Sequence, residues 1–75
     1  MWIRNQEITE LINADRIQVE NYRIYTYPPN NSGWIELGNY DTKERAIAVL
    51  DEIQEHLVKN GNATSGIKVF DMPQK

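Results

Sequence analysis

Apolar residues in the first 40 positions come in short runs that alternate with polar residues. Alternation with a period of two is typical of β-strands, because successive side chains of a strand point to opposite faces. The pattern therefore predicts four strands before the middle of the chain. They are expected at Met1 to about Asn5, Glu10 to Val19, Tyr22 to Tyr27 and Trp34 to Gly38.

The second predicted strand changes its alternation partway along. Ile12 and Ala14 share one parity, whereas Ile17 and Val19 share the other. A slip of this kind inside a strand indicates a bulge or a kink, because a shift of one residue moves every side chain to the opposite face. We expect the strand to be irregular between residues 13 and 16.

Two turns are expected among the later strands. The pair Glu20-Asn21 predicts a tight turn after the second strand. The stretch from Pro28 to Gly33 is the strongest break in the chain. Its two prolines remove backbone donors from any ladder, and Asn31 and Gly33 tolerate positive φ.

The stretch from residue 43 to about residue 59 carries a helical repeat of apolar positions. The apolar side chains recur at spacings of three and four residues and form a broad stripe. A stripe of this width suits a helix that lies on a sheet and is too wide for a coiled-coil seam. We expect Ile53 and Leu57 to point at the sheet. The whole stripe consists of Ala46, Ile47, Val49, Leu50, Ile53 and Leu57.

Both ends of this helix carry recognisable signals. Asp41 is expected to be the N-cap residue, and Glu44 is placed three residues later, where it can reach back to the amide of the cap residue. Glu44 also puts negative charge at the positive end of the helix dipole. At the other end, Asn60-Gly61 predicts a stop, because Gly61 can adopt the left-handed conformation.

A fifth strand is predicted from Ile67 to Met72, closed by Pro73. The element order ββββαβ predicts an α+β fold, with an antiparallel sheet of about five strands and one α-helix packed on one face. The last strand can lie beside the first strand or beside the fourth. We favour antiparallel pairing with the first strand, because it keeps the alternation of the sheet.

Composition limits the size and the chemistry of the protein. The 75 residues include 8 Lys+Arg against 11 Asp+Glu, for a net charge of −3, and they contain no cysteine. This predicts one small globular domain over residues 1–75 and excludes disulfide frameworks, thiolate metal sites and thiol nucleophiles. A core of this size supplies roughly 3 to 5 kcal/mol of net stability, which argues against an enzyme with a large buried cavity.

The chain also lacks signals for membrane insertion or export. No run approaches the roughly 20 apolar residues that a transmembrane helix needs. Arg4 and Glu7 interrupt the first residues, where a signal peptide would be apolar. We therefore expect a cytoplasmic protein with no membrane association.

Residues with catalytic potential are few. His56 is the only histidine, and it lies at the edge of the apolar stripe, one turn after Glu52. We interpret it as a boundary residue with Glu52 as its i, i+4 partner, and we assign it no catalytic role. No metal-binding motif is present, and the Gly38 to Asp41 loop has one glycine and an acid where a phosphate site needs several glycines. We expect no enzyme activity, no cofactor and no metal.

Seven aromatic residues stand out in so short a chain. If Ile24, Ile35 and Leu37 face the helix, strand alternation places three aromatic side chains on the opposite face, near an arginine. This candidate surface consists of Arg23, Tyr25, Tyr27 and Trp34. Trp2 and Arg4 share one face of the first strand, and the pattern leaves open which face that is.

Two interpretations of this aromatic surface stay open. It is either a half-buried sheet face on which Tyr and Trp pack across strands, or a surface for a protein partner or for self-association. Aromatic sheet faces also stack single-stranded bases, but such surfaces need basic surroundings. With a net charge of −3, nucleic acid is disfavoured as a partner.

Three segments of the chain resemble segments of other proteins. They are the opening Met1-Trp2-Ile3-Arg4, the stretch from Leu37 to Ile53 that reads LGNY, TKERA and VLDEI, and the closing Val69-Phe70-Asp71-Met72-Pro73. On these segments, a little under half of its length, the chain resembles a group of small uncharacterised proteins of Gram-positive bacteria, their phages and mobile elements. The resemblance implies a sheet-plus-helix fold and a phage or mobile-element setting, and it carries over no catalytic residues.

These observations favour a non-enzymatic module that binds a protein of the host or of the element. An alternative is an acidic inhibitor that imitates nucleic acid, and a second is a weak single-stranded nucleic-acid binder. Mimicry needs carboxylates gathered on one face. Residues 43–59 instead hold three basic residues and four acidic ones, so their net charge is only −1.

Overall fold

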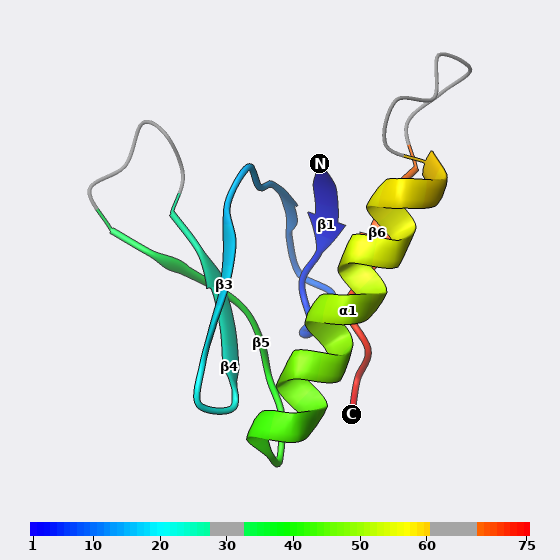
Figure 1. Cartoon of the computed structure of the whole chain (residues 1–75). Helices are drawn as coiled ribbons and strands as arrows, with labels where there is room; N and C mark the ends of the chain where they lie inside the picture. The colour runs from blue at the N-terminus through cyan, green and yellow to red at the C-terminus, as the bar shows by residue number, and fades with distance from the viewer. Residues whose placement is uncertain (28–32, 61–67) are drawn as a thin grey trace.

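The computed structural model of the chain describes residues 1–27, 33–60 and 68–75 (Figure 1). These residues form an α+β fold of six short strands and one α-helix, which confirms the predicted fold class. The elements in chain order are β1 (Trp2–Arg4), β2 (Leu11–Asn13), β3 (Ile17–Glu20), β4 (Arg23–Thr26), β5 (Ile35–Asn39), α1 (Lys43–Asn60) and β6 (Phe70–Asp71).

The strands are divided between two small sheets, where the sequence predicts one. One sheet has the order β2-β1-β6 and the other has the order β3-β4-β5. The helix α1 packs against β3 and β4, and in Figure 1 it crosses in front of the β1 and β6 side of the molecule. We call the two sheets the terminal sheet (β2-β1-β6) and the hairpin sheet (β3-β4-β5).

The division occurs at the slip in alternation of the second predicted strand. β2 pairs with β1 through Ile3 and Ile12, and Ala14 N then donates to the carbonyl of Met1 at 2.8 Å. After this bond the chain leaves the terminal sheet and enters β3 at Ile17. One continuous strand would have to turn either Ile12 or Ile17 outward, so a break between the sheets resolves the conflict.

The last strand lies beside the first, as favoured, but its direction is the opposite of the expected one. β6 pairs with β1 in parallel, with Ile3 opposite Phe70 and Arg4 opposite Asp71. The antiparallel expectation assumed one continuous meander, and the break between β2 and β3 removes that relation between strand directions. The predicted start of this strand at Ile67 lies outside the described residues.

The hairpin sheet is built from two antiparallel pairs. Glu20 pairs with Arg23 across a two-residue turn, and Asn21 takes a φ of 56° there. The turn is therefore Asn21-Tyr22, one residue later than predicted, and asparagine tolerates this left-handed conformation. Of the predicted break from Pro28 to Gly33, residues 28–32 lie outside the described residues.

A register shift between β4 and β5 lets two consecutive residues enter the core. Ile24 lies opposite Gly38 and Tyr25 lies opposite Glu36, so Leu37 is the extra residue of a bulge. Leu37 and Gly38 are both buried. Ile24 is also buried and Ile35 packs against the same core, which confirms that Ile24, Ile35 and Leu37 belong to the inner side of the sheet.

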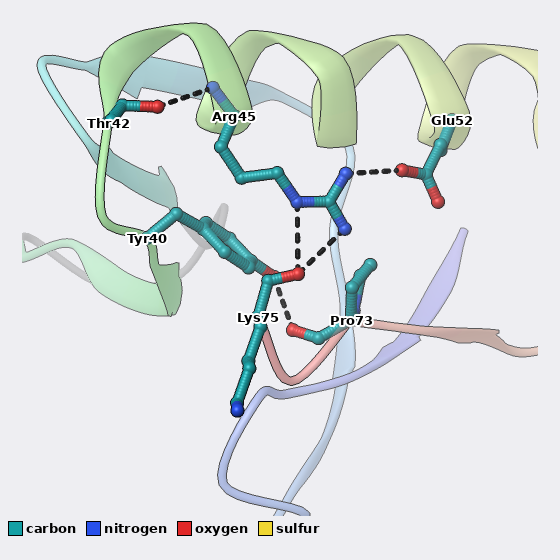
Figure 2. Close-up of polar contacts among 6 residues, drawn as sticks. All are labelled: Tyr40, Thr42, Arg45, Glu52, Pro73 and Lys75. Atoms are coloured by element: carbon teal, nitrogen blue, oxygen red, sulfur yellow. Dashed lines mark hydrogen bonds and ion pairs between the residues drawn. The ribbon is translucent and has the colours of Figure 1, made fainter.

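Thr42, and not Asp41, caps the N-terminus of α1. The hydroxyl oxygen of Thr42 accepts from Arg45 N at 3.1 Å (Figure 2), and its carbonyl accepts from Ala46 N at 3.1 Å. The helix begins at Lys43, so Asp41 stands one residue too early for its side chain to cap. The helix ends at Asn60, and the predicted stop at Gly61 lies outside the described residues.

The buried side of α1 is narrower and shorter than predicted. Ala46, Val49 and Ile53 are buried, as expected for Ile53, whereas Leu57, which lines an open hollow together with Ile53 and Ile17 of β3, is 50% exposed. The lengths explain the difference, because the 18 residues of α1 span about 27 Å, while strands of at most five residues span about 17 Å. The end of the helix therefore extends past the strands (Figure 1).

One core joins both sheets and the helix. Among the described residues, two buried polar side chains belong to this core and both are bonded: the Thr26 hydroxyl donates to the carbonyl of Arg16, and Asn5 bonds to the β1–β2 turn. The buried apolar residues are Ile3, Ile12, Ala14, Ile24, Leu37, Tyr40, Ala46, Val49, Ile53 and Met72.

Polar contacts hold the last residues against the fold (Figure 2). The Tyr40 hydroxyl donates to the carbonyl of Pro73 at 2.8 Å. The Arg45 guanidinium donates to the carbonyl of Lys75 from Nε at 2.9 Å and from Nη2 at 2.7 Å, and it pairs with Glu52 at 3.1 Å. These contacts fix residues 73–75 beside the start of α1.

Candidate functional site

The candidate site is the side of the hairpin sheet that faces away from the core. Ile24 and Thr26 of β4 are fully buried. The alternating residues Arg23 and Tyr25 of β4 therefore point outward, and Tyr27 continues this alternation beyond the strand. Trp34 precedes β5 and packs beside Tyr25. We call Arg23, Tyr25, Tyr27 and Trp34 the aromatic face.

The ring of Tyr25 contacts the other two rings of the aromatic face edge to face. The Tyr25 and Tyr27 centroids are 5.6 Å apart with an interplanar angle of 82°. The Tyr25 and Trp34 centroids are 6.0 Å apart at 65°. Both arrangements are those that aromatic quadrupoles favour. Tyr25 thus stands between the other two rings and supports both.

Arg23 completes the cluster. Its guanidinium carbon lies 5.4 Å from the centroid of the Trp34 ring, within range of a cation–π contact. Its Nε also lies 3.0 Å from Oε1 of Glu36, on the neighbouring strand. The positive charge of Arg23 is therefore compensated by a carboxylate and by an aromatic ring.

The Tyr25 hydroxyl is drawn into a polar chain with β3. In the amide orientation that satisfies its neighbours, Gln18 donates to this hydroxyl at 3.1 Å and accepts from Nε and Nη2 of Arg16 at 3.2 Å. Partial burial raises the pKa of Tyr25, and nearby Tyr27 and Glu20 raise it further. Tyr25 is therefore a neutral phenol at physiological pH. Its hydroxyl is held by Gln18, and its ring is held by Tyr27 and Trp34.

A small hollow opens among these side chains. It has a volume of about 140 Å³ and is lined by Glu20 and by the four residues of the aromatic face. Trp34 is 51% exposed and Tyr27 is 45% exposed, so both rings are accessible from solvent. Pockets that bind metabolites measure roughly 300 to 1,000 Å³. The hollow therefore accommodates one small side chain and not a metabolite.

The structure brings together all four residues that the sequence singles out. It adds Glu20 to the lining of the hollow and Gln18 to the support of Tyr25. Sequence reasoning missed both residues, because their placement depends on the register of β3 against β4, where Gln18 lies opposite Tyr25. The Glu20-Asn21 turn signal was the nearest sequence indication of that register.

His56 lies elsewhere and contacts the end of the chain. Its ring meets the Phe70 ring edge to face, with centroids 5.4 Å apart, and its Nε2 lies 3.1 Å from the carbonyl of Lys68. The expected partner Glu52 instead pairs with Arg45. The expected pair is replaced because Phe70 of β6 and Lys68, which precedes this strand, contact His56. This arrangement supports packing of the last strand.

The terminal sheet also has exposed apolar residues, but they are more scattered. Ile3 and Ile12 fill the inner face, so Trp2, Arg4 and Leu11 lie on the outer face. This answers which face Trp2 and Arg4 occupy. A separate hollow of about 390 Å³ lies between α1 and the start of the chain. Its lining is Met1, Ala14, Asp15, Ile17, Leu50, Ile53, Gln54 and Leu57.

The aromatic face thus offers ring surfaces, a phenol and an indole donor, and a compensated arginine. The part of the chain that the structure describes contains no group of three His, Asp or Glu side chains placed to hold a metal ion. Within the same residues, no helix has the length and apolar character needed to cross a membrane. A comparison with family models, curated proteins and solved structures finds no match for the chain.

Proposed function

We propose that this chain is a non-enzymatic protein-interaction module that binds its partner through the aromatic face. The observation that carries the proposal is the pair of half-exposed rings, Trp34 and Tyr27, which lie outside the core and are held in place by Tyr25 and Arg23. Trp, Tyr and Arg dominate the binding energy of protein interfaces. The resemblance of the chain to proteins of Gram-positive bacteria and their mobile elements supports a setting in the bacterial cytoplasm.

Contacts with neighbouring side chains hold these rings in place, and this favours binding. A ring that is already fixed loses little side-chain freedom when a partner covers it, so more of the contact energy appears as affinity. Trp34 has two such supports, the edge of Tyr25 and the guanidinium of Arg23. An exposed aromatic residue without neighbours would lack this advantage.

The charges of the molecule support a protein partner over nucleic acid. A nucleic-acid surface needs cations that are available for phosphates, whereas Arg23 is already paired with Glu36. Nucleic-acid mimicry would need accessible carboxylates in a row. On α1, Glu52 pairs with Arg45 at 3.1 Å and Glu55 pairs with Lys59 at 3.2 Å, which reduces any such row.

A capture experiment tests the proposal. Wild-type protein, Trp34→Ala and Trp2→Ala are immobilised and exposed to lysate of a Gram-positive host, and the retained proteins are identified by mass spectrometry. Trp2 is the matched control, because it is an exposed tryptophan on the terminal sheet. We expect one protein to be retained by the wild type and by Trp2→Ala and to be lost with Trp34→Ala.

Two results would contradict the proposal. One is a specific protein that Trp34→Ala retains as well as the wild type does, which would place the binding surface elsewhere. The other is retention of nucleic acid that falls steeply with salt, which would indicate binding to phosphates. Circular dichroism of each variant must show the wild-type fold, so that a loss of capture reports on the surface.

A further inference from the structure

We infer that the segment bound by the aromatic face is an extended, uncharged, proline-rich peptide of the partner protein. This inference rests on the proposed function and names the chemistry of the partner at the same site. Four properties of the face lead to it: its area, its shape, its hydrogen-bonding groups and its charge.

The two exposed rings alone offer less area than an interface between folded domains buries. Trp34 and Tyr27 expose about half of their surfaces, at 51% and 45%. Because an aromatic side chain offers roughly 150 to 250 Å², the two rings together present roughly 200 Å². A stable dimer interface buries about 800 Å² on each partner. A short segment that needs only a few anchoring contacts fits this area better than a second copy of the chain does.

The exposed rings offer side-chain contacts to a bound segment. The rings project from the outer side of the hairpin sheet, so a segment that packs on them meets side chains instead of backbone amides. The hollow of about 140 Å³ lies between ring faces and edges. Proline rings are rigid and present flat apolar surfaces at regular intervals along a polyproline II helix. They can pack between these rings with little loss of freedom.

The polar groups of the face also match such a segment. The indole N–H of Trp34 can only donate, and the Tyr27 hydroxyl can donate as well. A polyproline II segment has no internal hydrogen bonds, so its carbonyl groups are available to accept. Its prolines have no N–H groups and therefore lose no hydrogen bonds to water on an aromatic surface. Donors on the face thus meet acceptors on the peptide.

Charge favours a neutral occupant. The guanidinium of Arg23 already lies over the Trp34 ring, so a cationic side chain of a partner has no free access to that side of the ring. Glu20 lines the hollow and repels an anionic one. A segment with no charge at the contact avoids both costs. A basic or acidic peptide is therefore expected to bind more weakly than a neutral one.

The test is a fluorescence titration with decaproline, acetylated and amidated at its ends. It uses Trp2→Phe protein, in which Trp34 is the only indole that reports on binding. We expect a saturable change of Trp34 emission at peptide concentrations below about 1 mM. Adding Tyr27→Ala should weaken binding at least about fivefold, while adding Leu11→Ala, on the outer face of the terminal sheet, should leave it unchanged.

Several results would overturn the inference. They are the absence of a saturable response to decaproline, an equal response to a glycine–serine peptide of the same length, and no effect of Tyr27→Ala in a folded variant. Sedimentation equilibrium that shows a dimer dependent on Trp34 would also overturn it, because the occupant would then be a second copy. If decaproline fails while lysate capture still depends on Trp34, the inference fails and the proposed function stands. If both fail, both are wrong.

Discussion

The two small sheets share one core, yet their outer faces differ in kind. The terminal sheet is tied by polar contacts to the ends of the chain, as when Met72 N donates to the carbonyl of Arg4 at 3.1 Å. The hairpin sheet gathers Arg23, Tyr25, Tyr27 and Trp34 on its outer side, where they contact one another. The first arrangement holds the fold together, whereas the second fixes side chains that remain accessible.

Gln6 and Asn5 show how polar side chains next to the terminal sheet hold the fold together. The Gln6 side chain donates to the carbonyl of Gln74 at 3.0 Å and accepts from Asn39 N at 2.8 Å, so it joins the last residues to β5. Buried Asn5 accepts from Thr9 N at 2.9 Å within the β1–β2 turn. Side chains used in this way are not available to a partner. Exposed aromatic residues therefore point to a binding surface only where their side chains are not used to hold the fold together.

The largest expected effect lies on the inner side of the terminal sheet. Ile3 is fully buried and pairs with both neighbouring strands. Ile3→Ala should lower the free energy of unfolding by about 2 to 5 kcal/mol, enough to unfold so small a domain. Leu11→Ala, on the outer face of the same sheet, should change it by less than about 1 kcal/mol. Urea denaturation followed by circular dichroism measures both, and equal losses would remove the distinction between inner and outer faces.

The next effect concerns the turn of the terminal sheet. Asn5 is 6% exposed, and its Oδ1 accepts from the amides of Thr9 and Glu10 at 2.9 Å each. Asn5→Ala should cost about 2 to 3 kcal/mol, because it leaves these amides without a partner. The control is Asn13→Ala, at an exposed position of β2, with a cost below about 0.5 kcal/mol. A stable Asn5→Ala protein would show that the turn does not depend on this side chain.

Gly38 tests the place where β5 meets the end of the chain. A Cβ at Gly38 would lie 2.9 Å from Cε2 and from the hydroxyl oxygen of Tyr40 and 3.1 Å from Cε of Met72. Gly38→Ala should therefore cost about 1 to 3 kcal/mol by overpacking. At Gly33, a Cβ would meet nothing within 4 Å. Gly33→Ala should leave the melting temperature nearly unchanged, and a reversal of this order would refute the close contact.

Tyr40 should make stability depend on alkaline pH. Burial raises the pKa of Tyr40 to about 12 from its usual 10.0. The folded state therefore keeps this proton longer than the unfolded state, so stability is constant below about pH 10 and falls as the pH rises toward 12. Tyr40→Phe should cost about 1 kcal/mol at neutral pH, through loss of the bond to Pro73. Tyr40→Phe should also reduce the fall in stability at alkaline pH. If that fall is unchanged, another group causes it.

Local patterns were sufficient to predict the helix and the inner and outer sides of the hairpin sheet. The burial of Ile24 and Leu37 and the outward placement of Tyr25 follow from alternation within one strand. The slip after Ile12 was also visible in the sequence. Its consequence, a change of sheet and not a kink, depends on the packing of both halves around one helix and was not predictable locally.

Features that depend on distant residues were beyond the sequence. The parallel pairing of Phe70 with Ile3 depends on where the chain turns between the sheets. The capping role of Thr42 depends on the residue at which α1 begins, and two adjacent residues, Asp41 and Thr42, are both good caps. The part of Glu20 in the candidate site depends on strand register. Each of these features depends on how one segment is placed against another, and the periodicity of apolar residues does not give that placement.

The most direct test of the account is the free energy of unfolding of Trp34→Ala, measured in urea beside Ile24→Ala. Trp34 contributes an edge-to-face contact and a cation–π contact on the outside of the hairpin sheet. We predict a loss of about 1 to 2 kcal/mol for Trp34→Ala. Ile24 is fully buried on the inside of the same sheet, and we predict a loss of about 2 to 5 kcal/mol for Ile24→Ala. A loss for Trp34→Ala as large as that for Ile24→Ala would make Trp34 part of the core and contradict an aromatic face kept for a partner.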